Sequence, residues 1–86
     1  MPHKSHEVLE AELEEAGKLV KVGGTYFHFR SPEKLYKVIG LAIQESSESV
    51  CVIYQAEYNK KLVFVRDLDA WLKQPEDNVE RFQLVK

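Results

Sequence analysis

The stretch KLVFVRDLDAWLK, residues 61–73, changes from a strand pattern to a helix pattern without an intervening glycine or proline. Valines alternate with larger apolar side chains at its start, as they do along a strand, and apolar residues then recur at helical spacing over residues 68–72. Asp67 stands between the two patterns, where it can act as an N-cap by accepting a hydrogen bond from a backbone N–H two or three residues later. The stretch therefore predicts a strand that runs directly into one helical turn, with Trp71 buried in that turn.

Most of the chain after residue 17 shows strand patterns. Glycine, proline, serine and asparagine, which favour turns, separate the apolar segments. The expected turns lie at Gly23-Gly24, residues 30–33, Ser46-Ser47 and Asn59-Lys60, and a loop is expected at residues 74–78. The expected strands cover residues 18–22, 25–29, 35–44, 49–58, 61–66 and 81–85.

The two longest of these segments are predicted to pair as a hairpin closed around Ser46-Ser47. This register places Gly40 opposite Ile53, and a lone glycine inside a long strand indicates a bulge or a sharp bend. On the other face it stacks three apolar pairs, which are Ile43 with Val50, Leu41 with Val52, and Ile39 with Tyr54.

The order of these elements indicates the fold class. Strands joined by hairpin-like turns, then one helical turn, then a final short strand, are typical of SH3-like barrels, whose bent strands leave few exposed edges. We therefore expect a mainly β fold, a small SH3-like β-barrel of about five strands, with Trp71 and Leu72 closing its bottom. The alternative is an OB-like barrel, which would require a longer helix between its third and fourth strands.

The N-terminal residues 1–17 form a separate acidic extension. They carry one Lys and five Glu, a net charge of −4, whereas residues 18–86, the expected barrel, carry eleven Lys or Arg and nine Asp or Glu, a net charge of +2. An α-helix is expected over residues 6–16, capped by Ser5 and ended by Gly17. The narrow apolar stripe by which it should dock on the barrel consists of Leu9, Leu13 and Ala16.

Composition limits the classes of protein to which the chain can belong. Its 86 residues suffice for one domain, and no apolar segment approaches the roughly 18 residues of a membrane span. The N-terminus is too acidic for a signal peptide, and the single Cys51 fits a reducing compartment. We therefore expect a cytoplasmic protein that does not contact a membrane.

Four short motifs follow one another along the chain. They are Gly24, Tyr26, His28, Phe29 and Arg30; Tyr36, Val38, Ile39, Gly40, Leu41 and Ala42; Val52, Tyr54 and Tyr58; and Val65, Arg66 and Leu68. With these motifs, the segment from about Val20 to Val85 resembles a family of small bacterial proteins known as domain of unknown function 1653. The resemblance implies an SH3-like barrel and a cytoplasmic protein, and it implies no activity.

The chain departs from the family pattern at several places. Phe27 stands where the family usually has Arg, and residues 43–46 replace a polar His-Ser/Thr-Glu stretch. Phe64 replaces a Trp, and Asp67 replaces a Pro. If the family binds a ligand through that Arg and His, this chain binds it differently or not at all.

His28 is the one histidine within the expected barrel, on the same strand face as Tyr26. A catalytic base needs a nucleophile and an orienting partner within reach, and the sequence has no Ser-His-Asp or Cys-His spacing. A structural, hydrogen-bonded His28 is therefore favoured. Cys51 is expected to be a buried, inert thiol, and His3 and His6 to be a solvated tail rather than a metal site.

Arg66 and the aromatic residues are the remaining candidates. An ion pair of Arg66 with Asp67, Asp69 or Glu57 is the more common arrangement, whereas an anion contact beside an aromatic wall is the more specific hypothesis. Most aromatic side chains of so short a chain must be core, although one or two can line a groove for a peptide or a single-stranded nucleic acid. These aromatic residues are Tyr26, Tyr36, Tyr54, Tyr58, Phe64 and Trp71.

The sequence thus predicts a non-enzymatic protein- or peptide-binding module, a monomer or weak homodimer, with no catalytic residue, metal or cofactor. Its candidate binding residues are Tyr26, His28, Arg66 and Trp71. The alternative is an RNA- or DNA-binding SH3-like barrel, which is disfavoured because the basic residues are scattered rather than clustered. An enzyme that uses His28 is disfavoured by the lack of catalytic partners.

Overall fold

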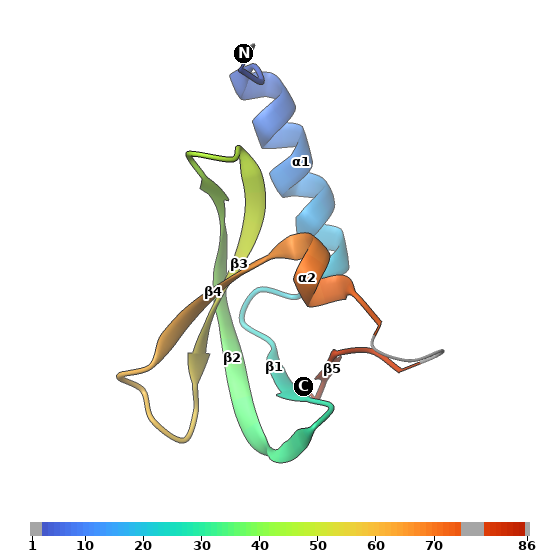
Figure 1. The fold of residues 1–86 in the computed structure, drawn as a ribbon, viewed down its shortest axis with the longest axis vertical. Coiled ribbons are helices and arrows are strands. Elements are labelled where there is room, and N and C mark those ends of the chain that lie inside the picture. Colours follow the sequence, from blue (N-terminus) through green and yellow to red (C-terminus); the bar gives the residue numbers. More distant parts are fainter. Residues whose placement is uncertain (1–2, 75–78, 86) are drawn as a thin grey trace.

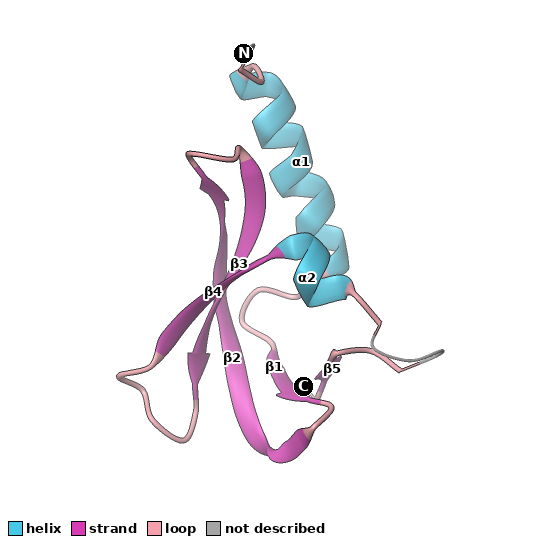
Figure 2. Ribbon diagram, viewed as in Figure 1, coloured by secondary structure: helices cyan, strands magenta, loops and turns pink. Residues whose placement is uncertain are grey.

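One antiparallel sheet and two helices are formed by residues 3–74 and 79–85, the part of the chain that this computed structural model describes (Figures 1 and 2). In chain order the elements are α1 (His6–Leu19), β1 (Thr25–His28), β2 (Ser31–Gln44), β3 (Ser49–Ala56), β4 (Val63–Asp67), α2 (Leu68–Leu72) and β5 (Phe82–Leu84). The strands pair in the order β4-β3-β2-β1-β5, so the last strand returns to pair with the first. No described helix has the length and apolar character needed to cross a membrane.

The sheet is open, with β4 and β5 as its two edges. The mainly β fold and the helical turn between the last two strands are confirmed, whereas the closure of the sheet into a barrel is not confirmed. The sheet is nevertheless strongly curved, because the guanidinium carbon of Arg66 in β4 lies 5.1 Å from the centre of the Phe82 ring in β5. Side chains of the two edge strands therefore meet across the concave face of the sheet.

The hairpin of β2 and β3 follows the predicted register at its tip and departs from it further along. Ile43 pairs with Val50, Leu41 with Val52, and Gly40 with Ile53, as predicted. The prediction that Ile39 faces Tyr54 is wrong, because a bulge between Val38 and Gly40 removes Ile39 from the ladder and pairs Tyr54 with Val38. The extra residue turns Val38 into the core, where it is fully buried, and leaves Ile39 exposed.

The start of the sheet differs from the prediction. Residues 18–22 do not form a strand, because α1 continues past Gly17 to Leu19, and the backbone N–H of Val20 donates to the carbonyl of Ala16. Val20 has no exposed surface, so its side chain holds the end of the helix against the sheet. The predicted loop at 30–33 is also shorter, since β2 begins at Ser31.

The N-terminal helix docks on the sheet by the predicted stripe. Ala16 is buried, and Leu9 and Leu13 are partly buried, while α1 contacts β2 and β3. The hydroxyl of Ser5 accepts a hydrogen bond from the backbone N–H of Val8, which confirms the predicted N-cap. Ahead of the helix, the backbone N–H of Lys4 donates to the Glu48 carboxylate at the far end of the hairpin.

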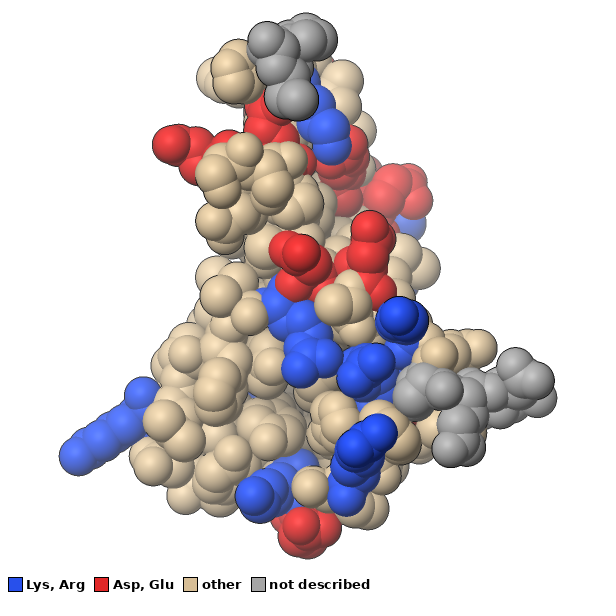
Figure 3. Space-filling view, viewed as in Figure 1, with Lys and Arg blue, Asp and Glu red and all other residues tan. Residues whose placement is uncertain are grey.

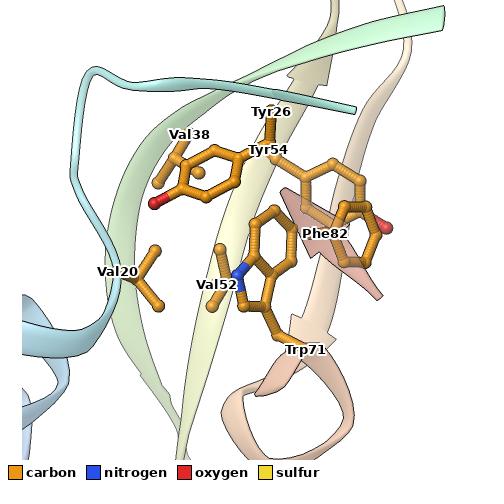
Figure 4. Close-up of a cluster of buried hydrophobic side chains, with 7 residues drawn as sticks. All are labelled: Val20, Tyr26, Val38, Val52, Tyr54, Trp71 and Phe82. Carbon is orange, nitrogen blue, oxygen red and sulfur yellow. The ribbon is translucent and has the colours of Figure 1, made fainter. Parts of the chain in front are cut away.

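The core lies between the concave face of the sheet and α2 (Figure 4). Trp71 stacks on Phe82 with ring centres 3.8 Å apart, and it meets Tyr26 and Tyr54 edge to face. Leu72, expected beside Trp71 at the bottom of the barrel, is 40% exposed, so Trp71 alone fills this position. The buried cluster consists of Val20, Tyr26, Val38, Val52, Tyr54, Trp71 and Phe82.

The junction of β4 and α2 lies where the sequence predicted it, but Asp67 does not cap the helix. Asp67 occupies the N-cap position without a side-chain hydrogen bond to the helix. Its carboxylate instead accepts hydrogen bonds from the Cys51 thiol, at 3.3 Å, and from the Ser49 hydroxyl, at 3.5 Å. The reason is that Asp67 ends β4 directly opposite Cys51 in β3, so its side chain faces the neighbouring strand. The loop predicted at 74–78 lies largely outside the described residues.

Candidate functional site

Every strand of the sheet contributes a side chain to one cavity of about 220 Å³ on the concave face. Phe64 and Arg66 are two residues apart in β4 and therefore point to the same face of the sheet. We call this cavity the aromatic–basic pocket. It is lined by His28 of β1, Tyr36 of β2, Tyr54 of β3, Phe64 and Arg66 of β4, and Phe82 of β5.

The aromatic walls of the pocket are packed against one another. Tyr54 meets Tyr36 edge to face, with ring centres 5.6 Å apart, and lies tilted against Phe64 at 5.5 Å. Phe82 contacts both tyrosines from the opposite edge of the sheet. Because each ring is fixed by its neighbours, the pocket presents a rigid apolar surface that a planar or apolar group can contact without ordering new side chains.

Arg66 supplies the positive charge of the pocket. Its guanidinium lies over the Phe82 ring, and no carboxylate among the described residues forms an ion pair with it. The pairing with Asp67, Asp69 or Glu57 is therefore not seen in this part of the chain. Asp67 follows Arg66 directly in β4 and points to the other face of the sheet. Arg66 thus stands beside an aromatic wall with its hydrogen-bond donors available to a ligand.

His28 forms the side of the pocket next to Arg66. Its Nδ1 accepts a hydrogen bond from the backbone N–H of Arg30 at 3.2 Å, and its ring meets Phe82 edge to face at 5.1 Å. Burial lowers the pKa of His28 below its ordinary value of 6.5, and the positive charges of Arg66, Arg81 and Arg30 lower it further. His28 is therefore neutral at neutral pH, with Nδ1 occupied as an acceptor and Nε2–H as a donor.

Two tyrosine hydroxyls meet at the rim of the pocket. The hydroxyls of Tyr36 and Tyr58 are 3.3 Å apart. Burial raises the pKa of Tyr36 to about 12, with smaller contributions from this hydrogen bond and from neighbouring groups. Tyr36 therefore keeps its proton at any physiological pH and adds a hydroxyl group to the aromatic wall.

Basic residues gather on the face that contains β1 and β5, whereas most of the visible acidic residues lie around α1 and the start of α2 (Figure 3). Arg30 and Arg81 are close enough to His28 to lower its pKa. The Nε of Arg81 is buried and has no hydrogen-bond partner among the described residues. The surroundings of the pocket are thus positive, although the chain as a whole carries a net charge of −2.

The four candidate residues from the sequence separate into two pairs. His28 and Arg66 line the pocket together. Tyr26 and Trp71 belong to the buried core cluster and line a separate, smaller cavity of about 130 Å³ rather than the aromatic–basic pocket. The Tyr26 hydroxyl instead accepts a hydrogen bond from the backbone N–H of Lys21 at 2.9 Å. Trp71 supports the pocket from behind, since it stacks on Phe82.

Sequence reasoning did not assign four of the pocket residues. Phe64 was recognised as an aromatic residue that could be core or groove, and its spacing could have assigned it to the site, because it is two positions from Arg66 in a strand. Tyr36 and Tyr54 were recognised as aromatic residues that could be core or groove, but only the three-dimensional arrangement shows which of their surfaces is free. Phe82 carried no local signal, since its position depends on the pairing of β5 with β1.

The family comparison identifies the chain. The sequence model of the family described as "Protein of unknown function (DUF1653)" matches residues 24–84, so the chain belongs to this family. The family resemblance seen in the sequence is therefore confirmed. No curated protein and no solved structure matches the chain. All residues that line the aromatic–basic pocket lie within the match, whereas α1 lies outside it.

Proposed function

We propose that this protein is a non-enzymatic, cytoplasmic binding module with an SH3-like arrangement of strands, and that its aromatic–basic pocket takes an acidic side chain or chain end of a partner protein. The observation that carries the proposal is Arg66, a cation on an aromatic wall with no ion-pair partner among the described residues. The strand order, with α2 between β4 and β5, supports the SH3-like arrangement.

The chemistry of the pocket favours a carboxylate. A guanidinium presents its donors in a planar fork that matches a carboxylate, and such charge-assisted pairs are stronger than hydrogen bonds between neutral groups. His28 adds a neutral donor beside Arg66, and the rings of Tyr54 and Phe64 can contact the apolar part of the same ligand. The pocket therefore combines one charged contact with an apolar wall.

The size of the pocket favours a side chain over a cofactor. Sites for drug-sized molecules and cofactors usually measure about 300–1,000 Å³, whereas this pocket measures about 220 Å³. A glutamate, an aspartate or a C-terminal carboxylate with one neighbouring side chain fits that scale.

The free edge of β4 supports a peptide as the ligand. The N–H of Ala56 donates to the carbonyl of Leu62, and in this antiparallel register the next residues that bond to β3 are Phe64 and Arg66. The N–H and C=O groups of Val63 and Val65 therefore point away from β3, and β4 pairs with no other described strand. An extended peptide can add to this edge as a further strand and place one side chain in the adjacent pocket.

Single-stranded nucleic acid is the competing ligand, because aromatic rings and arginines also bind bases and phosphates. The proposal can be tested by fluorescence anisotropy with labelled peptides of about six residues, a typical strand length, that alternate valine with either glutamate or lysine. An RNA of about ten nucleotides serves as the third probe. The valine–glutamate peptide is expected to bind most tightly.

Two variants locate the binding. Arg66→Gln should lower the affinity for the valine–glutamate peptide at least about tenfold, because it removes the charged contact. Lys37→Gln is the matched control, since it removes the same charge from the exposed side chain between Tyr36 and Val38, on the opposite face of β2. Equal binding of the lysine peptide, or tighter binding of the RNA, would contradict the proposal.

A further inference from the structure

A second and larger cavity lies between part of α1 and the sheet, beside the place where the helix docks. It measures about 530 Å³, within the range of sites that hold a substantial ligand. One wall is the helix, and the other is formed by the start of β3 together with the junction of β4 and α2. We call it the acid-rimmed groove, and it shares no lining residue with the aromatic–basic pocket.

The floor of the groove is apolar and only partly covered. Val8, Ala11 and Leu19 of α1 line it together with Val50 and Leu68. Val8 is 46% exposed and Leu19 is 61% exposed, although both residues belong to the docked helix. Leaving such surface in water is unfavourable, so a partner that covers it would gain free energy from burial.

The rim of the groove is acidic. Glu12, Glu15, Asp67 and Asp69 line it, and Lys4 is the one basic residue among the described residues of the lining. Lys4 pairs with Glu12 at 3.0 Å, and Lys18, which lies outside the lining, pairs with Glu15 at 3.0 Å. No Lys or Arg among the described residues pairs with Asp67 or Asp69. Figure 3 shows the acidic side chains gathered around α1 and the start of α2. The groove therefore combines an apolar floor with a net negative rim.

We propose that the acid-rimmed groove binds a basic amphipathic segment of a partner protein. Apolar side chains of the segment cover the floor, and its Lys or Arg residues pair with the carboxylates of the rim. The helical wall extends from Val8 to Leu19, about 17 Å at 1.5 Å per residue. This length suits a partner helix of about three turns, which would present a matching apolar stripe between basic residues.

Charge distribution argues against a second copy of the chain as the occupant. A two-fold dimer through this groove would place two acidic rims against each other, which is repulsive. A copy that instead presented its basic face would make a head-to-tail contact, and such contacts produce rings or open filaments rather than a closed pair. A different protein with a basic segment can neutralise the acidic rim without bringing two acidic rims together and without forming a ring or filament.

The groove is independent of the proposed pocket. Its helical wall lies outside the family match at residues 24–84, whereas the pocket lies entirely inside that match. The groove exists because α1 docks on the sheet, so it is a feature that the N-terminal segment adds to the family's domain. The two sites can therefore succeed or fail in separate experiments.

Selection from a displayed library of random peptides as long as α1, which has 14 residues, can test the groove with the full chain as the target. One class of selected peptides should be rich in apolar residues and in Lys or Arg. In solution, binding of a representative peptide of this class should weaken as salt rises, because part of it is electrostatic. Failure to recover such a class would overturn the proposal.

Two lysine substitutions on α1 test whether the peptide binds in the groove. Ala11→Lys puts a long basic side chain into the groove at an exposed position, and lysine favours helix. This variant should lower the affinity for the basic peptide at least about tenfold. Gly17→Lys makes the same charge change outside the lining, where an added Cβ meets no atom within 4 Å. This control should leave the affinity within about threefold of the parent value.

Further readings distinguish the groove from the alternatives. Asp69→Asn, at an exposed rim position, should lower the affinity for the basic peptide and make that affinity less dependent on salt. This variant does not alter α1, so it tests the groove even if Ala11→Lys were to disturb the helix. Arg66→Gln should leave the affinity for the basic peptide unchanged, because Arg66 belongs to the other site.

Equal losses of affinity in Ala11→Lys and Gly17→Lys would mean non-specific attraction to an acidic helix. A dimer that Ala11→Lys dissociates would make a second copy the occupant. Either result would overturn the proposal.

Discussion

The concave face of the sheet and the helix α1 are held in the molecule by different contacts. On the concave face, side chains from β1, β3, β5 and α2 interlock around Trp71 and Phe82, with several ring centres within 6 Å of each other. The helix α1 is held by a narrow stripe that ends at buried Ala16 and by the contact of Lys4 with Glu48. Long-range packing thus stabilises the first region, whereas a few contacts attach the second.

The two regions also differ in charge. The aromatic–basic pocket is surrounded by Arg30, Arg66 and Arg81, while the acid-rimmed groove has four carboxylates in its lining. Because opposite charges guide a partner to its own site and repel the wrong one, the two sites should not compete for the same ligand. A small domain can thus hold two surfaces that prefer ligands of opposite charge when one of these surfaces is added by a terminal helix.

The largest expected effect comes from the interlocked region. Trp71→Ala should lower the free energy of unfolding by about 3–5 kcal/mol, because it leaves a cavity beside Phe82. Leu72→Ala is the matched control, since Leu72 is the next residue of α2 and is 40% exposed. It should cost less than about 1 kcal/mol. Urea denaturation of both variants provides the comparison, and similar losses would mean that Trp71 is not the centre of the core.

A smaller effect is expected when α1 is removed. Deletion of residues 1–17 keeps Val20, which belongs to the core cluster. It should lower the melting temperature by about 4–8 °C, which corresponds to roughly 1 kcal/mol for a domain of this size. Thermal denaturation followed by circular dichroism measures this change. An unchanged melting temperature would show that α1 does not dock, and a chain that fails to fold would show that the two regions are not separable.

The pH dependence of stability should report the environment of the pocket. Because the pKa of His28 is lowered in the folded protein, the unfolded chain binds a proton more readily, and the free energy of unfolding should fall as the pH decreases below 6.5. His28→Asn retains an acceptor for the Arg30 N–H and cannot titrate. Urea denaturation at about pH 5 and about pH 7.5 should show a shallower change for this variant. An equal change in both proteins would mean that His28 is not perturbed.

The smallest expected effect lies at the junction of β4 and α2. A typical N-cap contributes about 1 kcal/mol, but the Asp67 side chain makes no hydrogen bond to the helix. Asp67→Ala should therefore change the free energy of unfolding by less than about 0.5 kcal/mol. A loss near the typical capping value would show that Asp67 caps α2 in solution.

Local pattern predicted the parts of the fold that depend on local contacts. The helical turn at 68–72 and the tip of the hairpin agree with the structure because the residues that determine them are neighbours in sequence. The bulge at Ile39 was suggested by Gly40, but its effect on the register was not, since the partner strand decides which residue leaves the ladder. The end of α1 was missed because buried Val20 extends the helix beyond Gly17.

The candidate site was only partly predictable for a related reason. His28 and Arg66 were recognised from their chemistry, and both line the pocket. Trp71 was equally prominent in the sequence, but its burial against Phe82 depends on the return of β5 to β1. No short stretch of sequence contains that pairing, so the separation of pocket residues from core residues required the structure.

Binding of an acidic peptide to the aromatic–basic pocket is tested most directly by following the amide chemical shifts of the isotopically labelled protein while the valine–glutamate peptide is added. The largest changes should lie at His28, Arg66 and Phe82, together with Val63 and Val65 at the edge of β4, and Arg66→Gln should abolish them. Changes confined to α1, or no change at any residue of the pocket, would contradict binding in this pocket.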